Sequence, residues 1–360
     1  MAYSRRKFLT GAAAGVGASL VGVPSGRSEQ APRADIPTPR AKALMEIFGL
    51  RYPIFQAPSG GADLASAISN AGGMGAIPLW RTSSEIARDS VTRLRGLTKQ
   101  PFIVNYVLTF EPQSLPAAVD AGAPVVQFSW GVPAKATVSA IQRARAKFGV
   151  QVATAEGARA ALDAGAAYLV AQGQEAGGHV QSSTPLHVIL PKVLAEARDI
   201  PVLVAGGIST GAHLRTALLA GAAGALLGTR FMATQESNAH PEYKHALVQS
   251  NGADAALSVC FQDGWPAATH RTLRNGTLTR WEAAGCPPPG QRPGEGDVVA
   301  TGPNGRRAIR YSLSLPQRDY EGTVTDLAMY AGQGVGDVKD VPAVRDLLVR
   351  LWAECLAARG

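Results

Sequence analysis

The sequence predicts an α/β protein, a (β/α)₈ barrel that carries a C-terminal extension of helices and loops. Two observations indicate this fold: eight short apolar segments recur between residues 53 and 231, and helix-like segments separate them. Eight strands with intervening helices in about 180 residues fit a closed barrel better than an open sheet. The open, doubly wound alternative would need G-x-G-x-x-G after its first strand, where the chain instead reads QAPSGGADLA (56–65).

Each predicted strand is a short apolar run, as expected of parallel strands that are buried on both faces. Several of the segments between them end in Ala-Gly, which is typical of a helix followed by a left-handed glycine. The predicted strands are 53–58, 74–79, 101–108, 124–130, 150–155, 168–173, 201–207 and 224–231. The predicted helices are 62–72, 83–97, 112–122, 134–149, 155–165, 185–199 and 211–222.

The alternation of strands and helices stops after Phe231. Residues 233–248 predict a helix, 281–307 a long loop rich in proline and glycine, and 323–358 a further helical region. We expect this extension to pack over or beside the top face of the barrel and to complete the active-site cleft. The predicted domains are a leader and linker at 1–35, the barrel at 36–231 and the extension at 232–360.

The first thirty residues have the pattern of an export signal. Arg5 and Arg6 precede Phe8 and Leu9, and an uncharged run of small residues follows at 10–23. This run is too short and too weakly apolar to span a bilayer, so we expect no stable membrane span. Adjacent arginines before Phe-Leu resemble a twin-arginine signal, which predicts export to the periplasm by the twin-arginine machinery. The alternative is a basic, disordered tail.

Composition narrows the classes of partner. The net charge is +8, but no basic stripe with interleaved aromatic residues follows the leader, so we predict no nucleic-acid partner. An anionic ligand suffices to explain a modest positive excess. Cys260, Cys286 and Cys355 lie far apart, without a CxxC motif or a Cys/His cluster, so no metal site is predicted.

Two glycine turns predict a phosphate-binding site. In (β/α)₈ enzymes phosphate groups favour the loops after the seventh and eighth strands. Here those strands end in AGGIS (205–209), with Gly206 and Gly207, and in LGTRF (227–231), with Gly228 and Thr229. Glycine lets backbone N–H groups face an anion, and a helix that begins after the first turn adds a positive dipole end. The alternative is two tight strand-to-helix turns without a ligand.

The loop after the predicted strand 168–173 carries a candidate catalytic residue. The stretch LVAQGQEAGGHVQSS (169–183) loses its bulky side chains at Gly173, Gly177 and Gly178 and then presents His179. Consecutive glycines indicate that something approaches the backbone closely or that φ is positive. Because His179 follows a barrel strand, we predict a catalytic role; the alternative is a surface histidine at the end of a loop.

Seven segments together resemble the nitronate monooxygenase family, whose members are FMN enzymes on a (β/α)₈ barrel. QGQEAGGH with ISNAGGMGAI is the specific part of the resemblance, although a flavin-dependent enoyl-acyl-carrier-protein reductase family has a similar loop. The segments are PIFQAPSGG (53–61), ISNAGGMGAI (68–77), VNY (104–106), QGQEAGGH (172–179), PVLVAGGI (201–208), LLGTRFMATQES (226–237) and YAGQGVG (330–336).

The resemblance implies roles for individual residues. His179 would be the catalytic base, a task suited to a histidine that is neutral near pH 7. Glu175 would orient the loop or cap a backbone N–H. The implied FMN contacts are Ala57, Pro58, Asn105 and Gln172 at the flavin ring, the backbone of Gly177 and Gly178, Gly206, Gly207, Gly228 and Thr229 at the phosphate, and Gln333 at the ring or phosphate edge.

The implied activity is the oxidation of alkyl nitronates, a small-molecule substrate, by O₂ to carbonyl compounds and nitrite. An NAD(P)H-dependent FMN reductase acting on quinones or enoyl thioesters is the alternative enzyme, and a flavin- or phosphate-binding barrel without catalysis is the alternative outside enzymes. Three departures from the family pattern concern the substrate. Ser59 stands where methionine is frequent, Val180-Gln181 replace Arg-Gly, and the segment 281–307 exceeds a minimal member.

Overall fold

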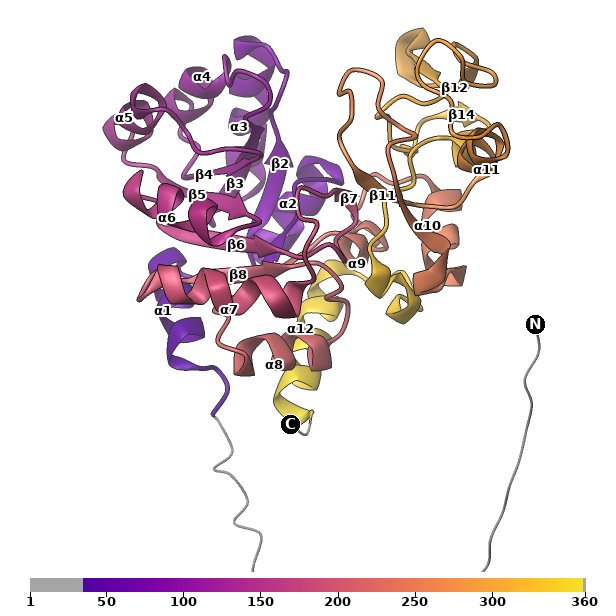
Figure 1. Ribbon diagram of the computed structural model, residues 1–360. Helices are drawn as coiled ribbons and strands as arrows, with labels where there is room; N and C mark the ends of the chain where they lie inside the picture. The colour runs from indigo at the N-terminus through magenta and orange to yellow at the C-terminus, as the bar shows by residue number, and fades with distance from the viewer. Residues whose placement is uncertain (1–34, 359–360) are drawn as a thin grey trace, which may run out of the picture. The chain divides into compact units, whose positions relative to one another are not determined.

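The computed structural model describes residues 35–358 and confirms the predicted barrel (Figure 1). The predicted leader lies outside the described residues except for Asp35. Within the described part of the chain, no helix has the length and apolar character needed to cross a membrane.

Eight parallel strands form the barrel, in the order β1-β9-β8-β6-β5-β4-β3-β2. A bridge between Phe55 and Met74 joins the first and last strands of this order, with Met74 N donating to the Ile54 carbonyl at 3.0 Å. The sheet is therefore nearly closed. Its strands are β1 (Ile54–Gln56), β2 (Gly75–Pro78), β3 (Phe102–Val107), β4 (Val125–Ser129), β5 (Lys147–Val152), β6 (Tyr168–Gln172), β8 (Val202–Ala205) and β9 (Gly224–Leu227).

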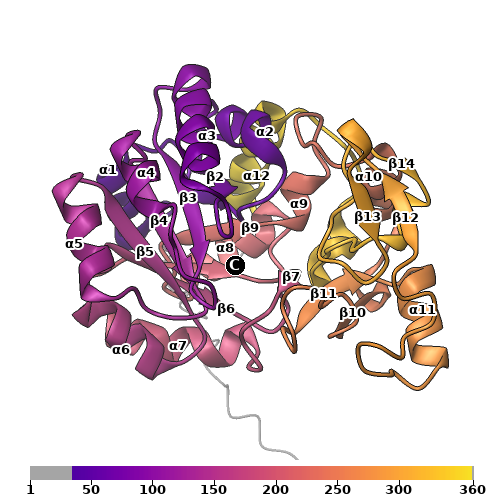
Figure 2. The ribbon, with the colours of Figure 1, turned by 90° about the horizontal axis from the view of Figure 1, so that it is seen from above.

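Helices surround these strands, as the view in Figure 2 shows. Ser83, Thr154 and Thr210 accept hydrogen bonds from the first turns of their helices, which fixes where those helices begin. The helices in barrel order are α2 (Gly61–Asn70), α3 (Ser84–Leu97), α4 (Leu115–Asp120), α5 (Lys135–Arg143), α6 (Ala155–Asp163), α7 (Leu186–Ala197) and α8 (Gly211–Leu219).

The interior of the barrel is packed by aromatic and aliphatic side chains, including some from the preceding helix α1 (Pro39–Phe48). Phe48 contacts Phe55 and Tyr168 edge to face, with ring centroids 5.9 and 5.6 Å apart. A Cβ on Gly149 would lie 2.2 Å from the Tyr168 ring, so only glycine fits there. Because the interior is filled, ligands can bind only at the carboxyl ends of the strands.

The last helix of the chain completes the ring of helices. Only the one-turn helix α9 (Thr229–Met232) follows β9 directly. Helix α12 (Val344–Ala357), yellow in Figure 1, returns from the extension and packs against α8 and α2. Gly211 N donates to the Glu354 carboxylate at 2.9 Å, and a Cβ on Gly211 would lie 2.2 Å from the Leu351 carbonyl oxygen. The layer of helices around the barrel therefore includes α12, which follows most of the extension in the sequence.

Two barrel elements differ from the predicted bounds. The fifth strand is Lys147–Val152 rather than 150–155, and the helix before it ends at Arg143 rather than at 149. Arg145 turns the chain with φ 56°, and Thr154 serves as the cap of the next helix, so neither residue continues a regular element. Both errors arise because polar residues at strand ends carry no apolar periodicity.

The extension contains more strand than predicted. The expected helix 233–248 begins only at Pro241, since proline is suited to the first turn of a helix. The segment 281–307, expected to be a loop, contains strand β12, and 323–358 contains two 3₁₀ helices before α12. The extension elements are α10 (Pro241–Gln249), β10 (Ala255–Ser258), β11 (His270–Leu273), α11 (Gly276–Ala283), β12 (Val298–Thr301), β13 (Arg307–Ile309) and β14 (Glu321–Gly322).

One small sheet links the extension to the barrel. Strand β7 (Gly178–His179), within the loop after β6, pairs antiparallel with β11, which also pairs with β10. His179 lies opposite His270 in this register. The predicted catalytic histidine is therefore held by the extension as well as by the barrel.

Candidate active site

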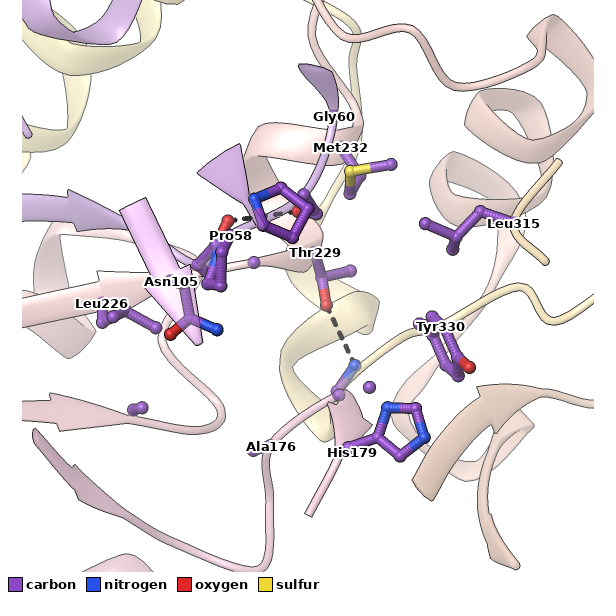
Figure 3. A pocket seen from close by; sticks show the side chains of 18 of the residues that line it. Pro58, Gly60, Asn105, Ala176, His179, Leu226, Thr229, Met232, Leu315 and Tyr330 are labelled. Atoms are coloured by element: carbon purple, nitrogen blue, oxygen red, sulfur yellow. Dashed lines mark hydrogen bonds between the residues drawn. The ribbon is translucent and has the colours of Figure 1, made fainter. Parts of the chain in front are cut away.

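A cavity of about 420 Å³ opens at the carboxyl ends of the barrel strands, between the barrel and the extension (Figure 3). Gln333 does not line it: its side chain is exposed, and the flanking Gly332 and Gly334 form the wall instead. The other predicted site residues all line the cavity, namely Ala57, Pro58, Asn105, Gln172, Gly177, Gly178, His179, Gly206, Gly207, Gly228 and Thr229.

A buried chain of hydrogen bonds orients Asn105. The Tyr168 hydroxyl donates to Gln127 Oε1 at 3.1 Å, and Gln127 Nε2 donates to Asn105 Oδ1 at 3.3 Å. Burial raises the pKa of Tyr168 well above its usual value, so its hydroxyl keeps the proton that starts this chain. Because the Asn105 oxygen is engaged, its Nδ2 is left as a donor toward a ligand.

Gln56, which sequence reasoning missed, shapes the wall formed by the loop after β1. Its Oε1 accepts from Ala76 N at 2.9 Å and its Nε2 donates to the Ser59 carbonyl. Ala57 N donates to the Leu227 carbonyl at 2.8 Å. These bonds fix the Ala57–Ser59 backbone along the cavity. The position of Gln56 at the end of a barrel strand was the available signal.

The two glycine turns form a cradle of backbone N–H groups. Gly207 has φ 73°, a conformation that a side chain disfavours, and helix α8 begins four residues later. Within residues 35–358, the N–H groups of Gly207, Ile208 and Gly228 donate to no protein acceptor. Thr229 Oγ1 accepts from Gly332 N at 2.9 Å (Figure 3), which leaves its proton available. Such a cradle is suited to an anion.

Hydrogen bonds hold the loop after β6 from both sides. Gln172 Oε1 accepts from Gln181 N at 2.8 Å and its Nε2 donates to the His179 carbonyl at 3.1 Å, so this amide braces the loop on which His179 lies. The Glu175 carboxylate accepts from Leu186 N, at the start of α7, as one of its expected roles required.

Arg271 on β11 is the second residue that sequence reasoning missed. Its guanidinium donates to the carbonyls of Gln174 at 2.7 Å, Ala176 at 3.2 Å and Ala255 at 3.0 Å. No signal in the sequence pointed to it, because its partners in the loop lie 95 and 97 residues away.

The imidazole of His179 is enclosed by aromatic rings. Trp265 stacks on it, with ring centroids 4.2 Å apart and planes at 20°, and Tyr330 lies 5.5 Å away. His179 Nε2 is buried and has no hydrogen-bond partner among the described residues. Burial, with a smaller effect of His270, lowers the pKa of His179 to about 3, so the ring is neutral at pH 7.

His270 is fully buried beside His179 and is also neutral. Its Nε2 accepts from Phe261 N at 3.0 Å, so Nδ1 carries the proton that it donates to the Ala268 carbonyl at 2.9 Å. Burial lowers the pKa of His270 to about 4. Both ring nitrogens are therefore occupied, which leaves His179 as the histidine whose nitrogen is free to accept a proton.

These features define the class of protein: a (β/α)₈-barrel enzyme with its site at the carboxyl ends of the strands, where a neutral imidazole and an anion cradle share one cavity. The model of the nitronate monooxygenase family matches residues 41–119 and 111–354. A nitronate monooxygenase from Pseudomonas aeruginosa is 30% identical over 348 residues, covering 82% of this chain and 94% of the relative.

Solved structures agree with this match. FabK from Thermotoga maritima superposes with a TM-score of 0.75 at 26% identity, covering 87% of this chain and 95% of that one. The nitroalkane oxidase from Streptomyces ansochromogenes superposes with a TM-score of 0.68 at 28% identity, covering 87% and 97%. The chain belongs to the nitronate monooxygenase family and is an oxidoreductase.

Proposed function

We propose that the protein binds FMN and oxidises alkyl nitronates with O₂, releasing carbonyl compounds and nitrite. The observation that carries this proposal is the neutral His179 ring, with its unpaired Nε2, in the same cavity as the glycine cradle. The family is one of flavin enzymes, so a bound flavin would supply the redox chemistry.

The residues present fit FMN. The free N–H groups of Gly207, Ile208 and Gly228 would hold its phosphate. The Asn105 amide and the backbone beside Ala57 would face the ring. When bound, the flavin supplies a two-electron acceptor that O₂ can reoxidise. Gln172 would act by bracing the loop, since its amide is already engaged.

His179, which lines the cavity, would accept a proton at an imidazole nitrogen from the carbon next to a nitro group. Burial lowers the pKa of His179 and so keeps the ring unprotonated at pH 7, but it also weakens the ring as a base until a negative charge forms beside it. The imidazolium formed in this apolar site would lie beside the nitronate anion formed at the same time. The two charges stabilise each other, which offsets the cost of burying either alone.

The deciding experiment measures two reactions of the purified flavoprotein, after its flavin has been released and identified by chromatography. Oxygen uptake with an ethyl nitronate, accompanied by nitrite release, supports the proposal. Rapid bleaching of the flavin by NADH or NADPH without oxygen, and no nitronate-dependent uptake, would replace it with the reductase alternative.

We propose that residues 1–35 direct export to the periplasm through the twin-arginine machinery, which carries folded proteins and so suits a chain that binds its cofactor first. The pattern of Arg5, Arg6, Phe8 and Leu9 supports this. Replacing both arginines (R5K/R6K) should move the protein from the periplasmic to the cytoplasmic fraction of the producing bacterium. An unchanged distribution between the fractions would refute the signal.

A further inference from the structure

One end of the cavity is walled by aromatic side chains that no step of the proposed reaction uses. Trp80 follows β2, Trp130 follows β4, and Trp265 comes from the extension. Trp265 lies 5.9 Å from Trp80 and 4.9 Å from Trp130 between ring centroids, and Phe110 stacks on Trp80 at 5.5 Å. Tryptophans from three separate segments, with Phe110 from a fourth, therefore converge on one aromatic wall, and Leu313 lies beside it.

Trp130 adopts an unfavourable backbone conformation at this wall. Trp130 has φ 61°, in the left-handed region that bulky residues rarely occupy. Its N–H donates to the Gln181 side chain at 2.9 Å, which ties it to the loop that carries His179. Backbone strain of this kind clusters at ligand sites.

The cavity carries no fixed charge. Among the described residues that line it, none is Asp, Glu, Lys or Arg. Arg81, near the wall, donates to the Gly264 carbonyl and packs over the Phe110 ring at 5.2 Å without joining the lining. A carboxylate or phosphate placed against the tryptophans would lose its hydration without gaining a counter-ion, which is costly.

Trp265 connects this wall to the reaction centre, because it stacks on His179 at 4.2 Å as well as contacting Trp80 and Trp130. A group that rests on the wall therefore lies beside the proposed base. We infer that the substrate carries an uncharged aromatic ring close to its nitro carbon, and that Trp80, Trp130 and Trp265 form the subsite for that ring. The nitro group in this inference rests on the proposed function, whereas the aromatic subsite rests on the geometry of the cavity.

The test compares three nitronates with the flavin-loaded full chain: those of nitroethane, 2-phenyl-1-nitroethane and 3-nitropropionate. Burial of a phenyl ring against aromatic side chains should raise kcat/KM about tenfold to hundredfold over the ethyl compound. The carboxylate compound should fall below the ethyl one. Equal kcat/KM for the phenyl and ethyl compounds would overturn the inference.

Variants of the wall supply the structural control. Trp80→Leu and Trp80→Ala should lower the ratio of phenyl to ethyl kcat/KM about tenfold or more. Trp352, which packs against Tyr52 at 6.1 Å outside the cavity, offers a matched control, and Trp352→Leu should leave the ratio unchanged. A ratio unaffected in both folded Trp80 variants would contradict the assignment of the subsite.

A binding measurement separates failure of this inference from failure of the proposed function. Two nitroalkanes that keep the proton on the nitro carbon are titrated against the flavoprotein without oxygen: uncharged 2-phenyl-1-nitroethane, and 3-nitropropionate with its carboxylate. Flavin absorbance and tryptophan fluorescence report binding. Tight binding of the phenyl compound, lost in Trp80→Ala, with no nitrite from any nitronate would refute the reaction and support the subsite. Turnover of all three nitronates with equal affinity for both ligands would support the reaction and refute the subsite.

Discussion

His179 is surrounded by rings, and that environment determines its acid–base behaviour. A carboxylate beside a histidine would favour its protonated form, whereas stacked Trp265 and the neutral His270 favour the neutral form. Trp265 also fixes the plane of the imidazole, so the ring needs no partner at Nε2 to be held in place. The result is a base that is oriented by packing alone.

His179→Gln should separate proton removal from the later oxidation. With a neutral nitroalkane, loss of the general base should lower kcat/KM on the order of 10²–10⁴-fold. With the preformed nitronate the loss should be much smaller, because that substrate has already lost its proton. Stopped-flow and steady-state rates on the two forms of one nitroalkane check this, with flavin content as the control. Equal losses on both forms would exclude the role as base.

Gly207→Ala should weaken cofactor retention beyond its effect on stability. An alanine at φ 73° strains the backbone by about 1–2 kcal/mol and tilts the amides of the cradle. Gly165, at φ 90° with open space around it, is the matched control on a turn away from the cavity. Both variants should lose similar unfolding free energy in urea, but only Gly207→Ala should purify with less flavin per chain. Equal flavin content in the two variants would contradict a phosphate contact at Gly207.

At the scale of elements, the loop after β6 depends on three neighbours. β11 pairs with it, Arg271 binds its carbonyls, and the Gly332 backbone lies against it so closely that a Cβ on Gly177 would come within 2.4 Å of Gly332 N. All three of these neighbours belong to the extension, as does Trp265. The extension therefore positions the site and does more than cover it.

Arg271→Met should loosen that loop while keeping much of the arginine's volume. Three carbonyls lose a charged donor, which costs roughly 1.5–3 kcal/mol for each bond in a buried setting, although the losses are not additive. We expect faster proteolysis within 173–183 and a kcat/KM at least tenfold lower. Arg274→Met is the control, because Arg274 forms an exposed ion pair with Glu282 that is worth at most about 1 kcal/mol. Identical proteolysis of both variants would rule out the anchoring role.

The eight strands were predictable from sequence because strands buried on both faces read as continuous apolar runs. Most residues assigned to the site by resemblance line one cavity, since barrel strands deliver their last residues to one rim. Arg271, Trp265 and the pairing of β7 with β11 were not predictable, because each depends on contacts between segments about 90 residues apart and has no local pattern. Gln333 was placed in the site by resemblance, but it does not line the cavity, whereas Gly332 and Gly334 on either side of it do.

At the scale of the whole described chain, the half-buried His179 and the buried His270 make stability depend on pH. Their pKa values fall from an ordinary 6.5 to about 3 for His179 and about 4 for His270. Below pH 6.5 the unfolded chain binds protons that the folded chain does not, so stability is full above pH 6.5 and declines as pH falls toward 4.

The free energy of unfolding in urea should therefore drop between pH 6 and pH 4.5 with a histidine contribution of roughly 1.4 kcal/mol per pH unit for each ring, about 2.7 for both. His179→Gln should remove about half of that slope, because the amide does not titrate. An identical slope in wild type and variant would show that the His179 ring takes up its proton in the folded state as readily as in the unfolded state.

The return of helix α12 to the barrel bears on how the chain is made. During translation all eight strands leave the ribosome while Leu347, Leu348 and Leu351, which are buried in the finished fold, have yet to emerge. Until then α8 and α2 lack the partner that covers their apolar faces. A chain in which α12 has not yet docked therefore exposes an apolar surface to chaperones and proteases.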